Sequence, residues 1–233
     1  RKDGYGVLGR IREIAKKYKA MSDKWNGLAI LHYAASRVGA LEVGFVPSKK
    51  GLNTKDIKDG VASNQIKLLW LLGEDEVVLN DKHNSFIVYQ GHHGDKGAES
   101  ADLILPGSAY TEKDGTFVNT EGRVQRTNIA VSPPGDARED WKIIRAFSSF
   151  VDKTLPYDNI FELRNRLAKI NELLVIENSL IKGGITDIGD TSIKLTKDNL
   201  KPKDINYFMT CPISRASETM AKCSISKSSL VKK

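Results

Sequence analysis

The stretch ADLILPGSAYTEKDGTFVNTEGRVQRT, residues 101–127, contains the pattern that decides the fold. It opens with an apolar run, Ala101 to Leu105, which is too short for a helix and ends at a proline, as a buried strand does. Two strand-like runs follow, Thr116 to Asn119 and Arg123 to Gln125. They flank a turn in which Gly122 can take a positive φ. The stretch therefore predicts a strand followed by a β-hairpin.

The stretch PPGDAREDWKIIRAF, residues 133–147, comes next and predicts a helix. Asp136 stands just before the helical pattern and Glu139 three residues later, which is an acidic form of the capping box. Apolar residues then recur at helical spacing and form one stripe, which consists of Ile143, Ile144, Phe147, Phe150 and Val151. The two stretches together predict a strand, a hairpin and a capped amphipathic helix.

Continuous apolar runs within this unit and upstream of it predict the strands of a sheet. Ile66 to Leu72 and Phe86 to Tyr89 are such runs, and Leu103 to Leu105 is a third; strands buried on both faces of a sheet have this composition. Residues 47–64 are polar and predict a surface loop, and residues 176–206 predict an extended connection. The apolar runs alternate with helical patterns. This alternation favours an α/β fold with a parallel sheet flanked by helices.

Helical periodicity marks three other segments. Gly4 to Ala20 carries one apolar face. Asp23 can cap a second helix, which Gly44 ends, and Asp158 begins a third. The apolar positions of these helices are, in order, Val7, Ile11, Ile14 and Tyr18; Leu28, Leu31, Ala35, Val38 and Leu41; and Ile160, Leu163, Leu167, Ile170 and Leu174.

The composition is that of an ordinary globular protein, with 40% hydrophobic and 28% charged residues. The net charge is +7, but the basic residues are scattered among 29 acidic ones and form a run only at 227–233. Aromatic residues do not alternate with basic ones as they do on the stacking surfaces that bind nucleic acid. The apolar runs are too short to span a bilayer. We therefore expect neither a nucleic-acid partner nor direct membrane insertion.

The cysteines and serines give no catalytic pattern. An iron–sulphur centre usually needs four thiolates, whereas Cys211 and Cys223 are the two cysteines of this chain. A disulfide between them is one alternative; two buried thiols in a reducing compartment is the interpretation we favour. Ser108, Ser132 and Ser214 lack the context of a nucleophile elbow. No glycine-rich phosphate-binding motif follows a predicted strand.

His92 and His93, with His83 and Asp95 nearby, form the one metal-like group in the sequence. Neighbouring residues on an extended chain point to opposite sides, so the two histidines should chelate a metal poorly. Glycines surround them and predict a tight loop in which the imidazoles form hydrogen bonds. We therefore predict no metal at this loop.

Glu121, Arg123 and Gln125 alternate along a predicted strand and should lie on one face of it. Arg123 could bind a phosphate group there, because arginine favours bidentate phosphate contacts. The alternative, which we favour, is an ion pair and hydrogen-bond network that fixes the hairpin.

Three acidic residues, Glu74, Asp75 and Glu76, follow a predicted strand end, where α/β proteins often bind ligands. Three acids in a row more often form a solvated turn, which is our expectation here. We accordingly predict no catalytic, cofactor-binding or metal-ligating residue in this chain.

Two parts of the sequence carry a resemblance to a known family. Residues 101–127 and 133–147 resemble the C-terminal part of the large iron–sulphur subunit of respiratory complex I, NADH:ubiquinone oxidoreductase. More loosely, they resemble the wider molybdopterin-dependent oxidoreductase family. INYFMTCPISRASETMAKCS, residues 205–224, resembles the terminal segment of the complex I subunit and no segment of the true molybdenum enzymes. The family also has the string GHHG, found here at residues 91–94, and no metal is assigned to it there.

The resemblance implies a division of the chain. Residues 1–175 would be the C-terminal part of a molybdopterin-oxidoreductase-like α/β domain, and residues 176–233 an extended linker and C-terminal docking segment. Because the chain begins at Arg1 rather than at methionine, we expect a split or fragmentary subunit. In the family the iron–sulphur clusters lie in the N-terminal region, so no cofactor is expected in this chain.

The implied function is that of a cluster-free structural part of the peripheral arm, which scaffolds electron transfer from NADH to ubiquinone. The chain would be non-catalytic within an enzyme complex. Its implied partners are the N-terminal iron–sulphur half and other peripheral-arm subunits, including the NADH-binding flavoprotein module. The implied location is the matrix side of the mitochondrial inner membrane, or the cytoplasmic side in a bacterium.

The alternative is a C-terminal fragment of an active molybdopterin enzyme such as a formate dehydrogenase. Residues 101–127 permit this interpretation. The closing segment and the lack of a segment with the metal ligand oppose it.

Overall fold

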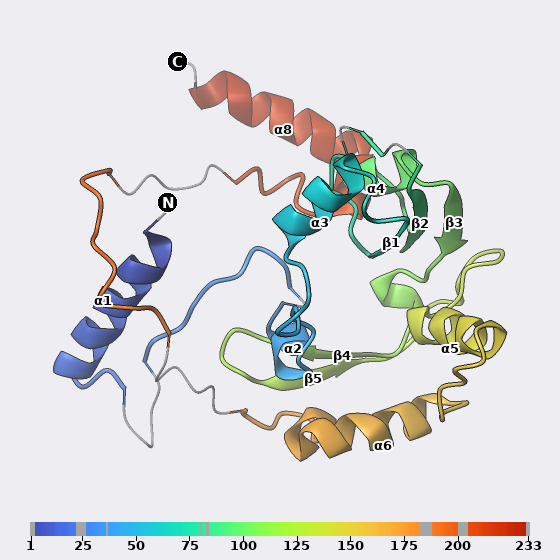
Figure 1. Cartoon of the computed structure of the whole chain (residues 1–233), viewed down its shortest axis with the longest axis horizontal. Coiled ribbons are helices and arrows are strands. Elements are labelled where there is room, and N and C mark those ends of the chain that lie inside the picture. Colours follow the sequence, from blue (N-terminus) through green and yellow to red (C-terminus); the bar gives the residue numbers. More distant parts are fainter. Residues whose placement is uncertain are drawn as a thin grey trace. The chain divides into compact units, whose positions relative to one another are not determined.

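The computed structural model of the chain describes residues 3–21, 27–35, 37–79, 81–82, 84–181, 188–199 and 205–231, and Figure 1 shows their secondary structure. The chain divides into two compact units. The first consists of Arg1–Phe45, Thr116–Arg126 and Arg164–Pro202, and the second of Val46–Gly115, Thr127–Leu163 and Lys203–Lys233. Both units therefore combine stretches that are distant in the sequence.

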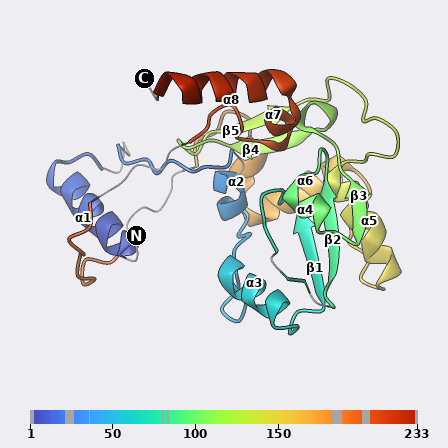
Figure 2. The ribbon, with the colours of Figure 1, turned by 90° about the horizontal axis from the view of Figure 1, so that it is seen from above.

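A three-stranded parallel sheet forms the core of the second unit. It consists of β1 (Leu68–Leu72), β2 (Phe86–Gly91) and β3 (Leu103–Pro106), in that order, and Figure 2 shows β1 and β2 running side by side. In the register, Trp70 lies opposite Val88, and Val88 lies opposite Leu103. The predicted α/β fold with a parallel sheet is therefore confirmed.

The central strand is the buried one. Ile87 is fully buried in β2 and packs with Leu71 and Tyr89. The outer strands are open, since Leu68 of β1 is 57% exposed and Ile104 of β3 is 54% exposed. The expectation of strands buried on both faces therefore holds for most of β2, but it is wrong for β1 and β3, because the described residues leave several of their side chains uncovered.

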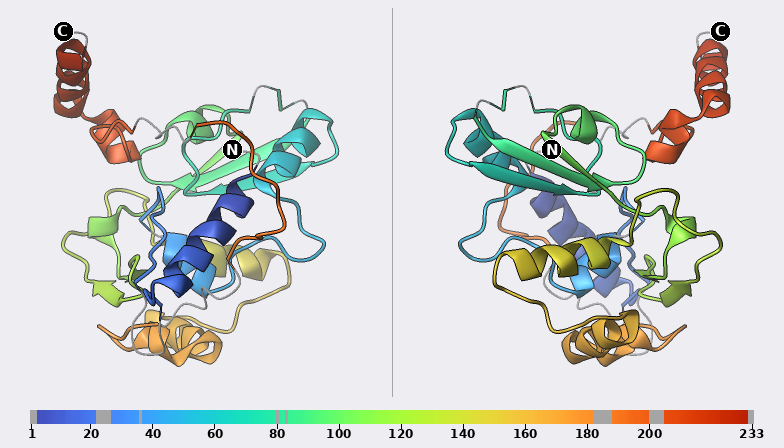
Figure 3. Two further views of the ribbon diagram at one scale, coloured as in Figure 1. Left: turned by 90° about the vertical axis from the view of Figure 1, so that its left-hand side faces the viewer. Right: turned by 90° about the vertical axis from the view of Figure 1, so that its right-hand side faces the viewer.

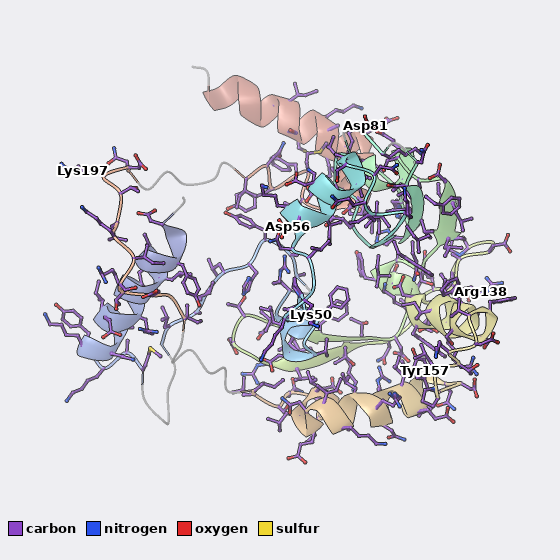
Figure 4. All side chains as sticks on the ribbon, in the orientation of Figure 1. Lys50, Asp56, Asp81, Arg138, Tyr157 and Lys197 are labelled. Atoms are coloured by element: carbon purple, nitrogen blue, oxygen red, sulfur yellow. The ribbon has the colours of Figure 1, made fainter. Side chains whose placement is uncertain are left out.

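Helix α3 (Thr54–Ala62) lies where the sequence predicted a surface loop over residues 47–64, so that prediction is wrong. Asn53 caps the helix, because its side chain accepts a hydrogen bond of 3.0 Å from the amide of Asp56; Figure 4 labels Asp56 in the first turn. Val61 is fully buried on the inner face. A good cap and one buried aliphatic residue thus outweigh the polar composition.

Helix α5 (Asp140–Phe150) confirms the helix predicted from residues 133–147, but it begins later than expected. Its N-cap is Glu139, without a side-chain cap hydrogen bond, so the predicted capping box at Asp136 is wrong. The reason is that Arg138 pairs with Gly107 in an isolated parallel bridge, which keeps the chain extended up to the helix start.

Two short elements complete the second unit before the hairpin. They are the helix α4 (Lys96–Glu99) and the 3₁₀ turn η1 (Tyr110–Glu112).

The predicted hairpin is confirmed as β4 (Gly115–Val118) and β5 (Val124–Thr127). Gly122 takes the expected positive φ, at +85°. The core of the first unit forms around the hairpin. It consists of Val118, Val124, Leu174 and Ile181, with Val38, Leu167 and Leu173 packed against them.

Helix α1 (Gly4–Lys17) confirms the first predicted helix, but its buried face is not the apolar one. Gly6, Gly9 and Ala15 are buried, whereas Ile14 and Tyr18 are exposed. Of the predicted stripe of α1, only Val7 is half-buried, and the described residues of this chain leave Ile11, Ile14 and Tyr18 exposed.

The prediction of a second helix, from Asp23 to Gly44, is mostly wrong. Only α2 (Arg37–Glu42) forms, residues 27–35 are not helical, and Asp23 lies outside the described residues. Leu31 is 84% exposed, so the stripe lacks the packing that stabilises most protein helices. Gly44 does end the helix, with φ at +73° and a hydrogen bond of 2.8 Å from Phe45 N–H to Ala40 O.

Helix α6 (Ile160–Ile170) begins two residues after Asp158. Asn159 is its cap, since its side chain accepts a hydrogen bond of 2.9 Å from the amide of Glu162. Leu174 lies in the following 3₁₀ turn, η2 (Glu172–Val175), rather than in the helix. Beyond η2, the described part of 176–206 contains no helix, as expected.

The closing segment is helical from Pro212 onwards, so the expectation of an extended segment is wrong there. It contains α7 (Pro212–Ala216) and α8 (Glu218–Val231), which follow each other in Figure 3. Pro212 occupies the first turn of α7, where its missing N–H costs nothing. None of the helices in the described part of the chain has the length and hydropathy needed to cross a bilayer.

Candidate functional site at the carboxyl edge of the sheet

The loops after β1 and β2 bring two carboxylates to the carboxyl edge of the sheet. Asp75 follows β1 and Asp95 follows β2. Open α/β sheets bind ligands at this edge, where neighbouring loops diverge. Here both carboxylates contact the same group, the guanidinium of Arg215 in α7.

Arg215 makes a separate contact with each of three carboxylates. Its Nε donates to Asp95, and its Nη2 donates to Asp75. Its Nη1 donates to Glu76 at 3.2 Å and to the carbonyl of Met209 at 3.3 Å. The Arg215 side chain is 17% exposed and that of Asp75 15%. Hydrogen bonds between charged groups are stronger than those between neutral groups, and the planar guanidinium can make several of them at once.

Asp75 therefore does not lie in the solvated turn that the sequence predicted, whereas the Glu76 side chain is 72% exposed, as expected, although it pairs with Arg215. Glu74 comes closer to that expectation, because it is exposed and its carboxylate accepts a hydrogen bond of 3.1 Å from the backbone of Glu76. Sequence reasoning did not identify Arg215 as a site residue. Its partners lie 120 to 140 positions away in the chain, and neither spacing nor a motif marks such a pair.

A second polar group lies at the end of β2. Buried Gln90 donates through Nε2 to Asp140, at 3.1 Å from Oδ1. The other carboxylate oxygen of Asp140 pairs with Lys113 Nζ at 2.6 Å. These contacts fix the start of α5 against the sheet. Ser108 is also buried, and its hydroxyl has no hydrogen-bond partner among the described residues.

The two histidines face each other, so the expectation that they point to opposite sides is wrong. Their Nδ1 atoms lie 2.8 Å apart, and their rings meet edge to face. Burial lowers the pKa of His92, and the neighbouring His93 and Lys113 lower it further. Asp95 is turned towards Arg215, and His83 lies outside the described residues. Within the described ranges, no group of three His, Cys, Asp or Glu side chains could hold a metal ion.

We therefore expect the double substitution His92→Ala and His93→Ala to leave the metal content of the purified assembly unchanged. Two imidazoles without a third ligand bind divalent ions weakly, whereas protein zinc sites use three or four ligands. Elemental analysis of the assembly is the measurement. Loss of one metal equivalent per chain, with all subunits retained, would refute this prediction.

Acid should release Arg215 from the carboxylates. The hydrogen bond from Arg215 lowers the pKa of Asp95, so the folded-state pKa lies below the unfolded value of about 3.9. Such a group stabilises the fold above its unfolded pKa and loses that effect as the pH falls through the folded pKa. Measured on the chain co-produced with the iron–sulphur part of the subunit, the difference in melting temperature between wild type and Arg215→Ala should be constant above about pH 5 and shrink in stronger acid. A difference that grows on acidification would contradict this.

In the first unit, the hairpin residues form the network that we favoured. Arg123 pairs with Glu121 at 3.2 Å and donates to the carbonyl of Asn178 at 3.4 Å. Arg123 also forms an isolated antiparallel bridge with Leu180. Gln125 is exposed. Arg123 thus joins the hairpin to the chain after η2, in agreement with a structural role.

Both cysteines are free thiols, but they are not the buried pair that we expected. Cys211 is exposed, and Cys223 is half-buried. Hydrogen bonds with Ser214 lower the pKa of Cys211. The Cys211 sulphur accepts the Ser214 amide and so caps α7; Ser132 is exposed. Cys211 and Ser214 therefore shape the turn that places Arg215.

Comparison with known proteins matches two regions of the chain. Residues 1–150 match the molybdopterin oxidoreductase family, and residues 184–223 match the C-terminal family of the G-type subunit of NADH-ubiquinone oxidoreductase. The first match includes Asp75 and Asp95, and the second includes Arg215. The contact at the carboxyl edge therefore joins the two matched regions.

Three relatives cover nearly the whole chain. The mitochondrial NADH-ubiquinone oxidoreductase 78 kDa subunit of Candida albicans is 46% identical over 95% of this chain and 31% of its own length. The NADH-ubiquinone oxidoreductase 75 kDa subunit of Reclinomonas americana is 44% identical over 96% of the chain and 32% of its own length. The G-type subunit of the NADH-quinone oxidoreductase of Rickettsia conorii is 42% identical over 96% of the chain and 31% of its own length.

The chain thus spans about a third of the length of these relatives. The family match covers well over half of the chain, and the relatives agree with each other in name. The chain belongs to the molybdopterin oxidoreductase family, and its homologues are the 75/78 kDa subunits of complex I and their bacterial counterparts.

Proposed function

We propose that this chain is a cluster-free structural part of the peripheral arm of complex I and scaffolds electron transfer from NADH to ubiquinone. One observation carries the proposal: Arg215, from the region matched to the G-type subunit, occupies the edge where an open α/β sheet would bind a ligand. A side chain of the protein itself thus fills the place where a ligand would bind. In this proposal Arg215 and the carboxylates that it contacts stabilise the fold and do not take part in catalysis.

The chemistry of this edge does not fit a pterin cofactor. Such a cofactor carries phosphate, which needs backbone N–H groups or cationic side chains that are free to bind it. Four carboxylates are present instead, those of Asp75, Glu76, Asp95 and Asp140. The cations beside them, Arg215 and Lys113, are held by these carboxylates. An anionic cofactor would therefore meet like charge at this edge.

The relatives are named as subunits of NADH-ubiquinone or NADH-quinone oxidoreductases. We infer that the chain assembles with the N-terminal iron–sulphur half of the same subunit and with the other peripheral-arm subunits, including the NADH-binding flavoprotein, as the resemblance implies. The relatives include mitochondrial and bacterial proteins. We propose the matrix side of the mitochondrial inner membrane or, in a bacterium, the cytoplasmic side of its membrane, as the resemblance implies. The proposed division into a domain of 1–175 and a segment of 176–233 accords with two separate family matches.

Affinity purification of the tagged chain from its own cells tests the proposal. We expect the other subunits of complex I to co-purify in equal amounts, together with NADH:ubiquinone reductase activity. Recovery of the chain without them would refute the assignment. The second candidate, a fragment of an active molybdopterin enzyme, is favoured only by the match over residues 1–150. It requires a molybdenum- or tungsten-containing assembly instead.

A further inference from the structure

Residues 188–196, here called the strap, are fastened along one face of α1 in the first unit. Figure 1 shows this orange segment running beside the helix. The amide of Asp190 donates to the carbonyl of Tyr5 at 3.0 Å. The amide of Thr196 donates to the carboxylate of Asp3 at 2.7 Å, and Asp3 is 3% exposed. Main-chain amides of the strap thus donate to α1 and to its N-cap residue, the latter 193 positions earlier in the sequence.

The strap packs against two glycines of α1, Gly6 and Gly9, and this contact surface is here called its seat. A Cβ atom at Gly9 would lie 2.9 Å from the backbone of Asp190, and one at Gly6 would lie 3.1 Å from the side chain of Ile193. Gly189 approaches Gly9 from the other side with φ at +79°, and a Cβ there would lie 2.0 Å from the Gly9 nitrogen. Glycine inside a helix is unfavourable by about 0.5–1 kcal/mol relative to alanine. The close approach of the strap explains why glycine nevertheless stands at positions 6 and 9.

Arginines of α1 add to this seat. Arg10 Nη1 donates to the carbonyl of Thr191, and Arg12 Nη1 donates to that of Gly189 at 3.4 Å. The side chain of Asp190 accepts from the amide and hydroxyl of Ser192, at 2.8 and 2.7 Å. The strap is therefore folded by its own hydrogen bonds and held by those of the helix.

A second seat lies in the second unit, where Arg215 contacts the carboxylates of Asp75, Glu76 and Asp95. Each of the three guanidinium nitrogens points to a different carboxylate. A lysine ammonium, which is a compact point charge on a flexible stem, cannot reproduce this fixed fork. The seat is therefore specific for a guanidinium group.

We propose that the described residues of the segment matched to the G-type subunit, 188–199 and 205–223, dock on the molybdopterin-type region of the chain at two places, one within each compact unit. The strap occupies the glycine face of α1, and Arg215 occupies the three carboxylates. Both seats lie within residues 1–150, and both occupants lie within residues 184–223. The proposal goes beyond the scaffold function, because it assigns a task to this segment that holds whichever electron-transfer complex contains the chain.

The first test compares two glycine-to-alanine changes in α1 by hydrogen exchange of the assembled complex. Gly9→Ala should accelerate exchange of the Asp190 and Thr196 amides by roughly tenfold or more, because the new Cβ displaces the strap. Gly4→Ala is the matched control, since a Cβ at Gly4 meets nothing within 4 Å; it should leave both amides unchanged. If Gly9→Ala prevents assembly, Gly6→Ala, with its milder contact, gives the same comparison. Unchanged exchange in the strap would overturn the first seat.

The second test addresses the guanidinium seat. Arg215→Ala and Arg215→Lys should both accelerate exchange of two amides by roughly tenfold, the one at position 215 in α7 and that of Ser217, which follows α7. The strap amides should keep their rates. Lys222→Ala, an exposed change in α8, is the control and should have no effect. Adding guanidinium ion at about 10 mM should restore slow exchange in Arg215→Ala, and ammonium ion should not. Full protection in Arg215→Lys, or equal rescue by ammonium, would overturn the specificity of the seat.

Discussion

Replacing Gly122 with valine should sharply reduce the amount of chain recovered in the assembled complex. Gly122 has φ at +85°, and a Cβ there would lie 2.3 Å from the carbonyl oxygen of Ile181. That contact is with backbone, which cannot rotate away, and the Ile181 amide is hydrogen-bonded to the Gly122 carbonyl at 2.8 Å. Backbone strain of a β-branched residue costs about 1–3 kcal/mol. The steric clash adds to it, against a typical total stability of about 5–15 kcal/mol.

The measurement is the amount of the chain and of intact complex on native gels, together with NADH oxidation per complex. Gly135→Val is the matched control: Gly135 also has a positive φ, +53°, but a Cβ there meets nothing within 4 Å. It should show the strain alone and a much smaller loss. A normal amount of complex with a selective loss of NADH oxidation would contradict a structural role for the hairpin.

Produced alone, the chain should aggregate or remain partly unfolded. The outer strands of its sheet expose apolar side chains such as Leu68 and Ile104, and Phe150 of α5 is 86% exposed. An open strand edge with apolar neighbours is prone to pair with other chains. We expect co-production with the iron–sulphur part of the subunit to restore a soluble, monodisperse species, because that part can cover these surfaces.

Size-exclusion chromatography and thermal unfolding of the isolated chain give the answer. The expected result is material in the void volume, or a broad transition without cooperativity. A compact monomer with one sharp transition would show that the chain is a complete domain, and the proposed dependence on the rest of the subunit would then be wrong.

The elements that the sequence predicted are those with strong local signals. The runs that form β1, β2 and β3 are short, apolar and bounded by polar stretches. Gly122 indicates a turn because glycine adopts a positive φ without strain. Helix α3 was missed because its composition is polar, although Asn53 followed by Asp56 is a recognisable cap. The helix predicted from Asp23 did not form over residues 27–35. Apolar residues at helical spacing stabilise a helix only when they are buried, and Leu31 is largely exposed.

The sequence did not predict the candidate site. It placed Asp75 after a strand but in a solvated turn, and it noted Asp95 only as a neighbour of the two histidines. Arg215, the partner of both carboxylates, comes from a segment more than 100 residues away, and the approach of the strap to Gly9 spans an even longer separation. Contacts of this kind depend on how the units fold, and a single sequence carries no periodic or compositional sign of them.

Elemental analysis of the purified complex that contains this chain tests the central claim most directly. The claim is that the chain belongs to complex I and holds no cofactor of its own, since its carboxyl edge is occupied by Arg215 and lined with carboxylates. The account predicts the iron of the iron–sulphur clusters and no stoichiometric molybdenum or tungsten. One molybdenum or tungsten atom per chain would contradict it.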